Sequence, residues 1–201
     1  MTPALSAVYD ELVARAAAPP LVTETEPLRA AFERRTGLFP ADHPRRAARD
    51  GAAWEDVLVA GGFAHRIGDA MDDPGERAMA DVLGRGQRGV FRIAAEGAHR
   101  FVIDLFGGGA FALLARDEIA RADGSADDSL FVGRIVAGTD GCAVLPGIVW
   151  LPGEATELVP PVVDAARVRG FSIDETVEAL LRMDCAYATL SRVKAAYAFR
   201  L

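Results

Sequence analysis

The sequence predicts an α+β protein with N-terminal helices, a central small antiparallel β-sheet or partly open five-stranded barrel, and a long C-terminal helix. Three observations support this prediction. Apolar residues recur at helical spacing up to about residue 84, alternate from residue 89 to about 150, and return to helical spacing after residue 160. Apolar residues make up 51% of the 201 residues, which is enough to build a core and argues against a disordered chain.

The change of period divides the chain into two parts. Residues 1–84 form an N-terminal helical segment, and residues 85–201 form a small β module with C-terminal helices. A chain of 201 residues is only slightly longer than a usual single domain, so we expect the two parts to share one core.

Four helices are predicted in the first part. Their approximate ranges are 3–18, 27–35, 44–60 and 74–83. Each follows a residue whose side chain can accept a backbone hydrogen bond at a helix N-terminus: Thr2, Thr25, Asp42 and Asp73. Proline or glycine residues follow each helix and end it.

Five short strands are predicted in the β module. Their approximate ranges are 90–94, 100–105, 110–115, 130–137 and 142–150. The run Gly107-Gly108-Gly109 joins the second strand to the third as a tight hairpin. An acidic loop at Asp123–Asp128 precedes the fourth strand. Pro146-Gly147 interrupts the last strand, so this strand should lie at an edge or contain a bulge.

Two helices complete the chain. The first follows Pro160-Pro161 and spans about 162–169. The sequence Ser172-Ile173-Asp174-Glu175 is a capping box, and it starts the longest helix, about 173–198. The buried side of this helix is predicted from the helical spacing of its apolar residues: Ile173, Val177, Leu180, Leu181, Tyr187, Leu190 and Tyr197.

The net charge and the two cysteines indicate which binding partners and which cellular compartment to expect. The net charge is −7, which disfavours nucleic acid unless basic residues gather on one face. Cys142 and Cys185 lie among apolar residues and are read as buried thiols in a reducing compartment. The sequence has no secretory signal pattern and no run long enough to span a membrane, so we expect a cytoplasmic protein without a membrane partner.

The sequence indicates no catalytic residue, no cofactor and no metal site. His65 and Asp69 are four residues apart and would share a helix face, but a solvated helix end explains them better than a metal or acid–base site. The three glycines at 107–109 join two strands and do not open a helix, so they are not read as a phosphate-binding loop.

Basic residues of the β module form the first candidate surface. Arg88 and Arg92 share strand parity, and Arg100 and Arg134 are expected to join them on an exposed face. A small barrel with such a face can bind single-stranded nucleic acid. An ordinary solvated sheet face is the competing interpretation, and the acidic total charge favours it.

The C-terminal end forms the second candidate surface. It brings together basic residues, Arg192 and Lys194, with the aromatic residues Tyr197 and Phe199. Cations at a helix C-terminus interact favourably with the helix dipole, which explains the charges. The two rings either pack on the core or form a docking surface for another protein.

Several segments resemble a family of uncharacterised bacterial proteins. They are Gly89-Val90-Phe91-Arg92-Ile93, the turn around Gly107, the helix start after Pro152-Gly153-Glu154-Ala155, and Ser191-Arg192-Val193-Lys194. The similarity covers about residues 32–201. It implies a stand-alone protein and carries over no catalytic residue.

The leading functional hypothesis is a non-catalytic cytosolic protein that serves as an adaptor or interaction partner for another protein or for a second copy of itself. The first alternative is a nucleic-acid-binding small β-barrel. The second alternative is an enzyme with an unrecognised site in a pocket between the β region and the long helix.

Overall fold

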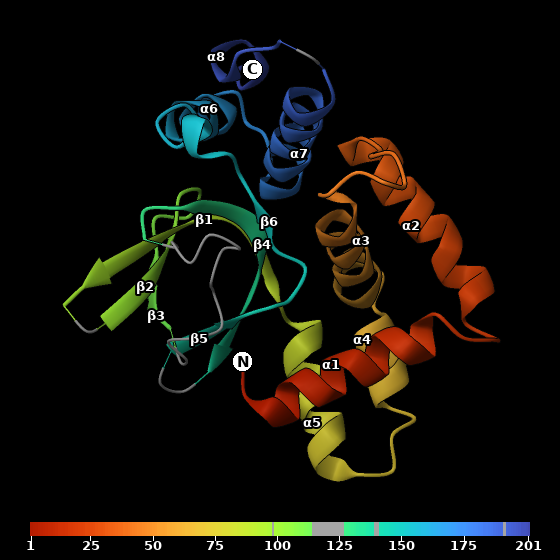
Figure 1. The fold of residues 1–201 in the computed structure, drawn as a ribbon. Coiled ribbons are helices and arrows are strands. Elements are labelled where there is room, and N and C mark those ends of the chain that lie inside the picture. The colour runs from red at the N-terminus through yellow and green to blue at the C-terminus, as the bar shows by residue number, and fades with distance from the viewer. Residues whose placement is uncertain (98, 114–126, 139–140, 191) are drawn as a thin grey trace.

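The structure is a computed structural model, and it describes residues 1–97, 99–113, 127–138, 141–190 and 192–201 (Figure 1). The helices are α1 (Pro3–Ala16), α2 (Val22–Thr36), α3 (Arg46–Glu55), α4 (Phe63–Gly68), α5 (Pro74–Gly84), α6 (Val159–Val168), α7 (Ile173–Thr189) and α8 (Ala195–Ala198). In Figure 1, α2 and α3 lie beside the sheet, α6 to α8 lie above it, and α1, α4 and α5 lie below. The predicted α+β class is confirmed.

The strands form one antiparallel sheet. They are β1 (Gln87–Glu96), β2 (His99–Asp104), β3 (Ala110–Ala112), β4 (Leu130–Gly138), β5 (Gly141–Val144) and β6 (Val149–Trp150). The order is β3-β2-β1-β4-β5, and β6 also pairs with β4. A bridge between Leu113 and Cys142 brings the two sheet edges together, so the sheet curls into a half-barrel.

The last predicted strand is two strands. Pro146-Gly147 lies between β5 and β6, and both strands pair with β4. The proline cannot donate to a ladder, which accounts for the break at this point. Most of the predicted acidic loop, residues 123–126, lies outside the described residues.

Two predicted helix starts in the N-terminal part are confirmed. In each, the capping side chain accepts a backbone hydrogen bond from a residue three positions later. The Thr2 hydroxyl accepts the N–H of Leu5 at 3.3 Å, and Asp73 Oδ1 accepts the N–H of Glu76 at 2.8 Å. The prediction of Thr25 as a cap is wrong, because α2 begins at Val22. The Thr25 hydroxyl instead donates to the carbonyl oxygen of Ala16 at 2.8 Å and ties α2 to the end of α1.

The third helix differs from its prediction in two ways. Asp42 does not cap it, because α3 begins at Arg46 without a side-chain cap. Its last predicted residues, Asp56–Ala60, form a π-helical turn, η1. Gly62, at φ +75°, then turns the chain into α4, a short helix that is not among the four predicted for this part of the chain.

The C-terminal helix is shorter than predicted. The capping box is present, with the Ser172 hydroxyl accepting the N–H of Glu175 at 3.2 Å. However, α7 ends at Thr189 and α8 follows as a separate turn. Val177, Leu180 and Leu181 are buried as predicted, whereas Leu190 and Tyr197 are 57% and 65% exposed because they lie beyond the end of α7.

The buried apolar side chains of the described residues form three clusters. The first joins α1, α4 and α5 to Val136, Ala143 and Leu145 of the sheet region. The second packs α6, α7 and α8 against one face of the sheet and includes Phe32 and Ala53. The third lies inside the curl of the sheet. The first two clusters therefore contain residues from both parts of the chain.

Cys142 and Cys185 are buried thiols, as predicted. Among the described helices, none is both long and apolar enough to cross a membrane.

Candidate functional site

A cleft of about 490 Å³ opens where the sheet meets the first turn of α7. Its lining residues come from η1, from β1, β2 and β4, from the turn after β2 and from α7: Ala60, Gln87, Arg88, Asp104, Phe106, Arg134, Ile173 and Asp174. This is the position that the enzyme alternative required, between the β region and the long helix. We refer to it as the arginine cleft, after the two guanidinium groups that it contains.

Arg88 and Arg134 bring two positive charges into the cleft. They are register partners on β1 and β4, so their side chains leave the same face of the sheet. Each side chain is only 8% exposed. Burial lowers the pKa of Arg134, and the neighbouring charge of Arg88 lowers it further. Like charges placed opposite each other in a sheet destabilise it, so this pair needs compensation.

Asp56 supplies part of that compensation. Its Oδ1 lies 3.5 Å from Arg88 Nη1 and 3.4 Å from Arg134 Nη2, and its Oδ2 accepts a hydrogen bond from Arg35 at 2.9 Å. The π-helical turn η1 begins at Asp56 and continues directly from α3. Such turns occur frequently at functional sites, because they displace a side chain from the regular helical position.

The contacts of the two guanidinium groups are long. Arg88 lies 3.2 Å from Asp174, and Arg134 donates to the carbonyl oxygen of Gly86 at 3.3 Å. With the two Asp56 contacts, all four distances lie between 3.2 and 3.5 Å. Charge-assisted hydrogen bonds are typically about 2.7–2.9 Å long. The guanidinium donors can therefore form closer contacts with an additional anion.

The rim of the cleft is negative. Asp104, at the end of β2, accepts the N–H of Phe106 at 2.9 Å through Oδ1, and its Oδ2 has no ion-pair partner among the described residues. A Cβ at position 107 would lie 2.5 Å from this Oδ2, so Gly107 leaves the space that the carboxylate occupies. Asp174 lies in the first turn of α7, and its side chain is 65% exposed.

Glu55 lies close to the cleft arginines but inside the core. It is 2% exposed, and its Oε1 accepts the N–H of Gly147. Burial raises its pKa to about 7, although Arg134 and Arg88 oppose this rise. A Cβ at position 147 would lie 2.6 Å from Glu55 Cδ, so the glycine of the β5–β6 break is what admits the carboxyl group.

The four arginines proposed for nucleic-acid binding do not form one exposed face. Arg88 and Arg134 are nearly buried, and Arg92, on the same face of β1, has a buried Nε without a hydrogen-bond partner among the described residues. Arg100 is the register partner of Ala95, so it leaves the opposite face, where it pairs with Asp127 at 3.3 Å. The expectation of a shared exposed face is wrong, because strand parity separates Arg100 and helix packing covers the others.

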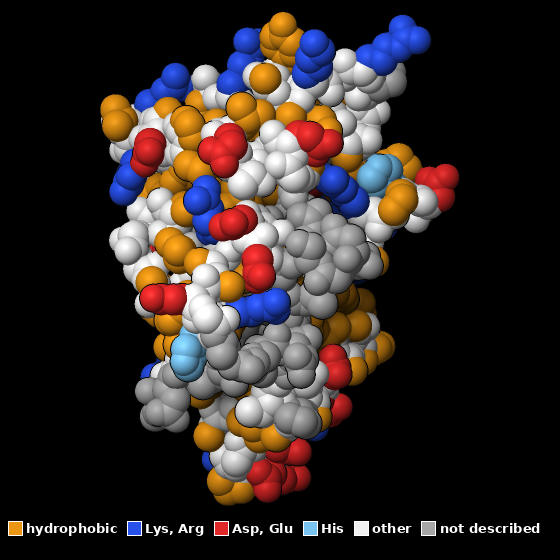
Figure 2. All heavy atoms as spheres, turned by 60° about the vertical axis from the view of Figure 1, so that its left-hand side comes forward, with side chains coloured by type: hydrophobic (Ala, Val, Ile, Leu, Met, Phe, Trp, Pro, Cys, Tyr) orange, Lys and Arg blue, Asp and Glu red, His pale blue; other side chains and the backbone are white. Residues whose placement is uncertain are grey.

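Figure 2 shows how charged side chains are distributed on one face of the molecule. Over the middle of this face Lys and Arg side chains lie among Asp and Glu side chains, whereas along its top several Lys and Arg side chains have no Asp or Glu between them. Nucleic-acid binding stays a prediction, and the four arginines named for it do not form a shared exposed face that would support it.

The C-terminal candidates separate into two groups. Phe199 is 3% exposed and packs near the ring of Tyr187, with the two centroids 6.1 Å apart, so it belongs to the core and not to a docking surface. Tyr197 is 65% exposed, and Arg192 and Lys194 are also exposed.

His65 is exposed on α4 and pairs with a residue of α5. His65 Nδ1 lies 3.2 Å from Asp81 Oδ1, and this contact connects α4 with α5 instead of pairing His65 with Asp69. Within the described residues, no group of three or more His, Cys, Asp or Glu side chains is arranged to hold a metal ion.

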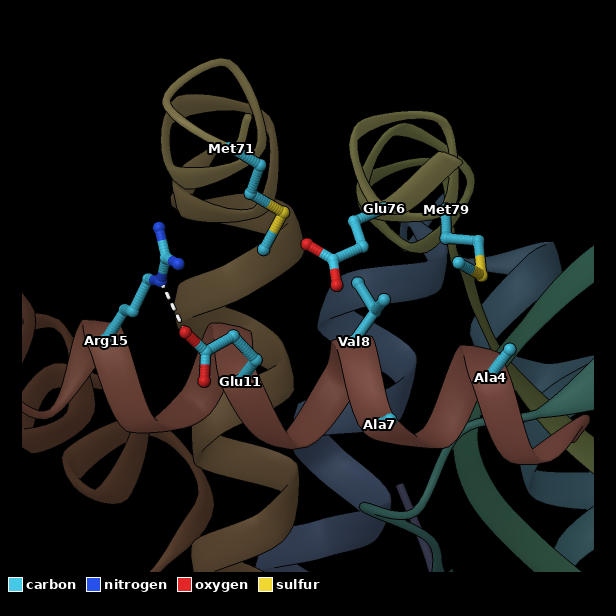
Figure 3. A pocket seen from close by; sticks show the side chains of 8 residues that line it. All are labelled: Ala4, Ala7, Val8, Glu11, Arg15, Met71, Glu76 and Met79. Carbon is cyan, nitrogen blue, oxygen red and sulfur yellow. Dashed lines mark hydrogen bonds and ion pairs between the residues drawn. The ribbon is translucent and has the colours of Figure 1, made fainter. Parts of the chain in front are cut away.

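A second hollow, of about 440 Å³, lies between α1 and the start of α5 (Figure 3). Figure 3 shows Met71 and Glu76 pointing toward α1, where Arg15 and Glu11 are paired at 2.6 Å. Because Arg15 and Glu11 are about half exposed and neutralise each other, this hollow offers weaker polar recognition than the arginine cleft.

The arginine cleft thus combines a cavity with two nearly buried cations. It has to be interpreted from its own chemistry, since no protein-family model, no curated protein and no solved structure matches this chain.

Proposed function

We propose that this chain is a non-catalytic binding protein that holds a small organic anion on the guanidinium groups of Arg88 and Arg134. The observation that carries the proposal is the pair of nearly buried arginines with contacts no shorter than 3.2 Å. In a partly desolvated cleft, a carboxylate or phosphate between two guanidinium groups forms strong charge-assisted hydrogen bonds. It also relieves the repulsion between the two cations.

The size and lining of the cleft favour binding of a small molecule. A volume of about 490 Å³ is within the range of about 300–1,000 Å³ that is usual for ligand sites. Ala60, Phe106 and Ile173 provide apolar contacts beside the charged groups. Among the described lining residues, no serine, cysteine, histidine or lysine is present, which favours binding over covalent chemistry.

A thermal-shift measurement tests the proposal. We expect at least one of the probes phosphate, citrate, malate and glycerol 3-phosphate to raise the melting temperature of the full chain in low-salt buffer. A ligand at 100 times its Kd adds about 2.7 kcal/mol to stability, which for about 200 residues corresponds to roughly 5–10 °C.

Variants identify the site in this experiment. Arg88→Gln and Arg134→Gln should each lose most of the ligand-induced shift. Arg34→Gln, which removes an exposed arginine on α2, makes the same change of charge and should keep the shift. The same shift in Arg88→Gln as in the unmodified protein would refute the proposal. Absence of a shift with all four probes, together with absence of binding by the amino acids and derivatives described below, would also refute it.

Protein–protein interaction through the C-terminal end is a second proposal. Tyr197 and Leu190 remain 65% and 57% exposed near the cations Arg192 and Lys194. Large exposed apolar side chains beside cations are typical of docking surfaces. Tyr197→Ala should change the free energy of unfolding by less than about 0.5 kcal/mol and weaken capture of a partner in a nuclease-treated pull-down. Capture of the same proteins by Tyr197→Ala would argue against this surface.

A further inference from the structure

The arginine cleft contains charges of both signs. The guanidinium groups of Arg88 and Arg134 are nearly buried, and the carboxylates of Asp104 and the exposed Asp174 line the same cleft. Asp104 Oδ2 has no ion-pair partner among the described residues, and Asp174 has a single contact, 3.2 Å from Arg88. The cleft can therefore attract an anionic group through the two guanidinium groups and a cationic group through Asp104, whose Oδ2 has no ion pair within the described residues.

A ligand with only one charge would satisfy only half of this arrangement. A simple anion on the arginines would lie near two carboxylates that repel it. A simple cation beside Asp104 would add positive charge near two arginines that Asp56 and Asp174 compensate only in part. A dipolar ligand meets both requirements, because its carboxylate can reach the arginines while its ammonium group donates to Asp104 and Asp174.

The apolar wall restricts the rest of the ligand. Phe106 and Ile173 line the cleft together with Ala60 and are suited to an apolar side chain. Gln87 can add a hydrogen bond through its side-chain amide. With these contacts, we infer that the ligand is a small zwitterion, a free amino acid with an apolar or aromatic side chain. This inference rests on the proposed function, because it assigns the anionic group to the same two arginines.

Calorimetric titration with matched probes tests the inference. The zwitterions L-leucine and L-phenylalanine are each compared with the N-acetyl derivative, which keeps only the negative charge, and with the amide, which keeps only the positive charge. We expect at least one of the two zwitterions to bind about 10- to 100-fold more tightly than both of its derivatives, since each derivative leaves charged groups unpaired.

A conservative variant localises the ammonium site. Asp104→Asn removes the negative charge but keeps an oxygen that can accept the N–H of Phe106, so the turn should persist. It should reduce the preference for the zwitterion over the N-acetyl derivative to about threefold or less, because the ammonium group loses its charged partner. Asp72→Asn, at an exposed position before α5, is the matched control and should leave the preference unchanged.

The possible outcomes separate this inference from the proposed function. Equal or tighter binding of the N-acetyl derivatives, with loss of binding in Arg88→Gln, would overturn the zwitterion and leave the anion site standing. Binding of phosphate or citrate without binding of either amino acid would have the same meaning. Absence of binding by every amino acid, derivative and anion probe would overturn both.

Discussion

Replacement of Asp184 by Asn is expected to lower the free energy of unfolding by about 3–5 kcal/mol. Asp184 is fully buried on α7 and forms ion pairs with Arg45 and, at 3.3 Å, with Arg49. Arg49 is itself 2% exposed and donates to the carbonyl oxygens of Thr36 and Leu181 at 3.1 Å. Without the carboxylate, the Arg49 guanidinium would remain in the core with no close counter-charge.

Urea denaturation followed by circular dichroism measures this loss. The control is Arg85→Gln, which breaks the exposed pair between Arg85 and Asp81 and should lower stability by less than about 1 kcal/mol. A double variant, Arg49→Met with Asp184→Leu, replaces the buried pair by apolar groups and should recover most of the loss. If Asp184→Asn were as stable as Arg85→Gln, the buried pair would not hold α3 and α7 together.

This ion-pair network also connects α3 and α7, the two helices that continue into residues of the arginine cleft region. Arg49 belongs to α3, and the π-helical turn that begins at Asp56 continues directly from this helix. Asp184 belongs to α7, whose first turn contains Asp174. Because the network fixes α3 against α7, it fixes both carboxylates that contact Arg88. We therefore expect loss of the network to disturb ligand binding as well as stability.

Local signals in the sequence were sufficient to predict several helix starts but not all boundaries. Caps at Thr2, Asp73 and Ser172 involve residues only three positions apart, so their pattern is visible without tertiary structure. The end of α7 is different. Helical spacing of apolar residues continues to Tyr197, but Leu190 adopts an extended backbone and ends the helix. The spacing therefore did not predict which of these side chains would be buried.

The candidate site was predicted only in part. Arg88 and Arg134 could be named as candidates because both are arginines expected on one face of the predicted sheet. The structure places them next to each other. The packing of α7 decides whether their face is exposed, and no local pattern reveals that packing. Asp174 had been assigned to a helix start, and Asp56 lay inside a predicted regular helix, so neither was connected with the arginines. The burial of Glu55 could not be predicted from the residues around it, because its partner Gly147 is 92 residues away in the sequence.

The unmodified protein is expected to lose roughly 2–3 kcal/mol more stability than Glu55→Gln between pH 5 and pH 8. The pKa of Glu55 rises from 4.5 to about 7 in the folded protein because the carboxyl group is buried. Between these two values, the unfolded chain releases the proton while the folded protein retains it. Stability therefore falls as the pH rises through this window, and the loss is complete above about pH 7. A glutamine side chain does not titrate, so the variant lacks this contribution.

Urea denaturation at several pH values between 5 and 8 isolates the effect, because other titrating groups contribute equally to both proteins. Gln at position 55 keeps an oxygen that can accept the N–H of Gly147, which limits structural change. Glu157→Gln, at an exposed position, should show the same pH dependence as the unmodified protein. Parallel pH profiles for the unmodified protein and Glu55→Gln would mean that Glu55 titrates normally. In that case Glu55 would be negatively charged at every pH in this range, and anion binding in the cleft would change little between pH 6 and 8. With a pKa of about 7, Glu55 instead loses its proton within this range, and anion binding should weaken as the pH rises.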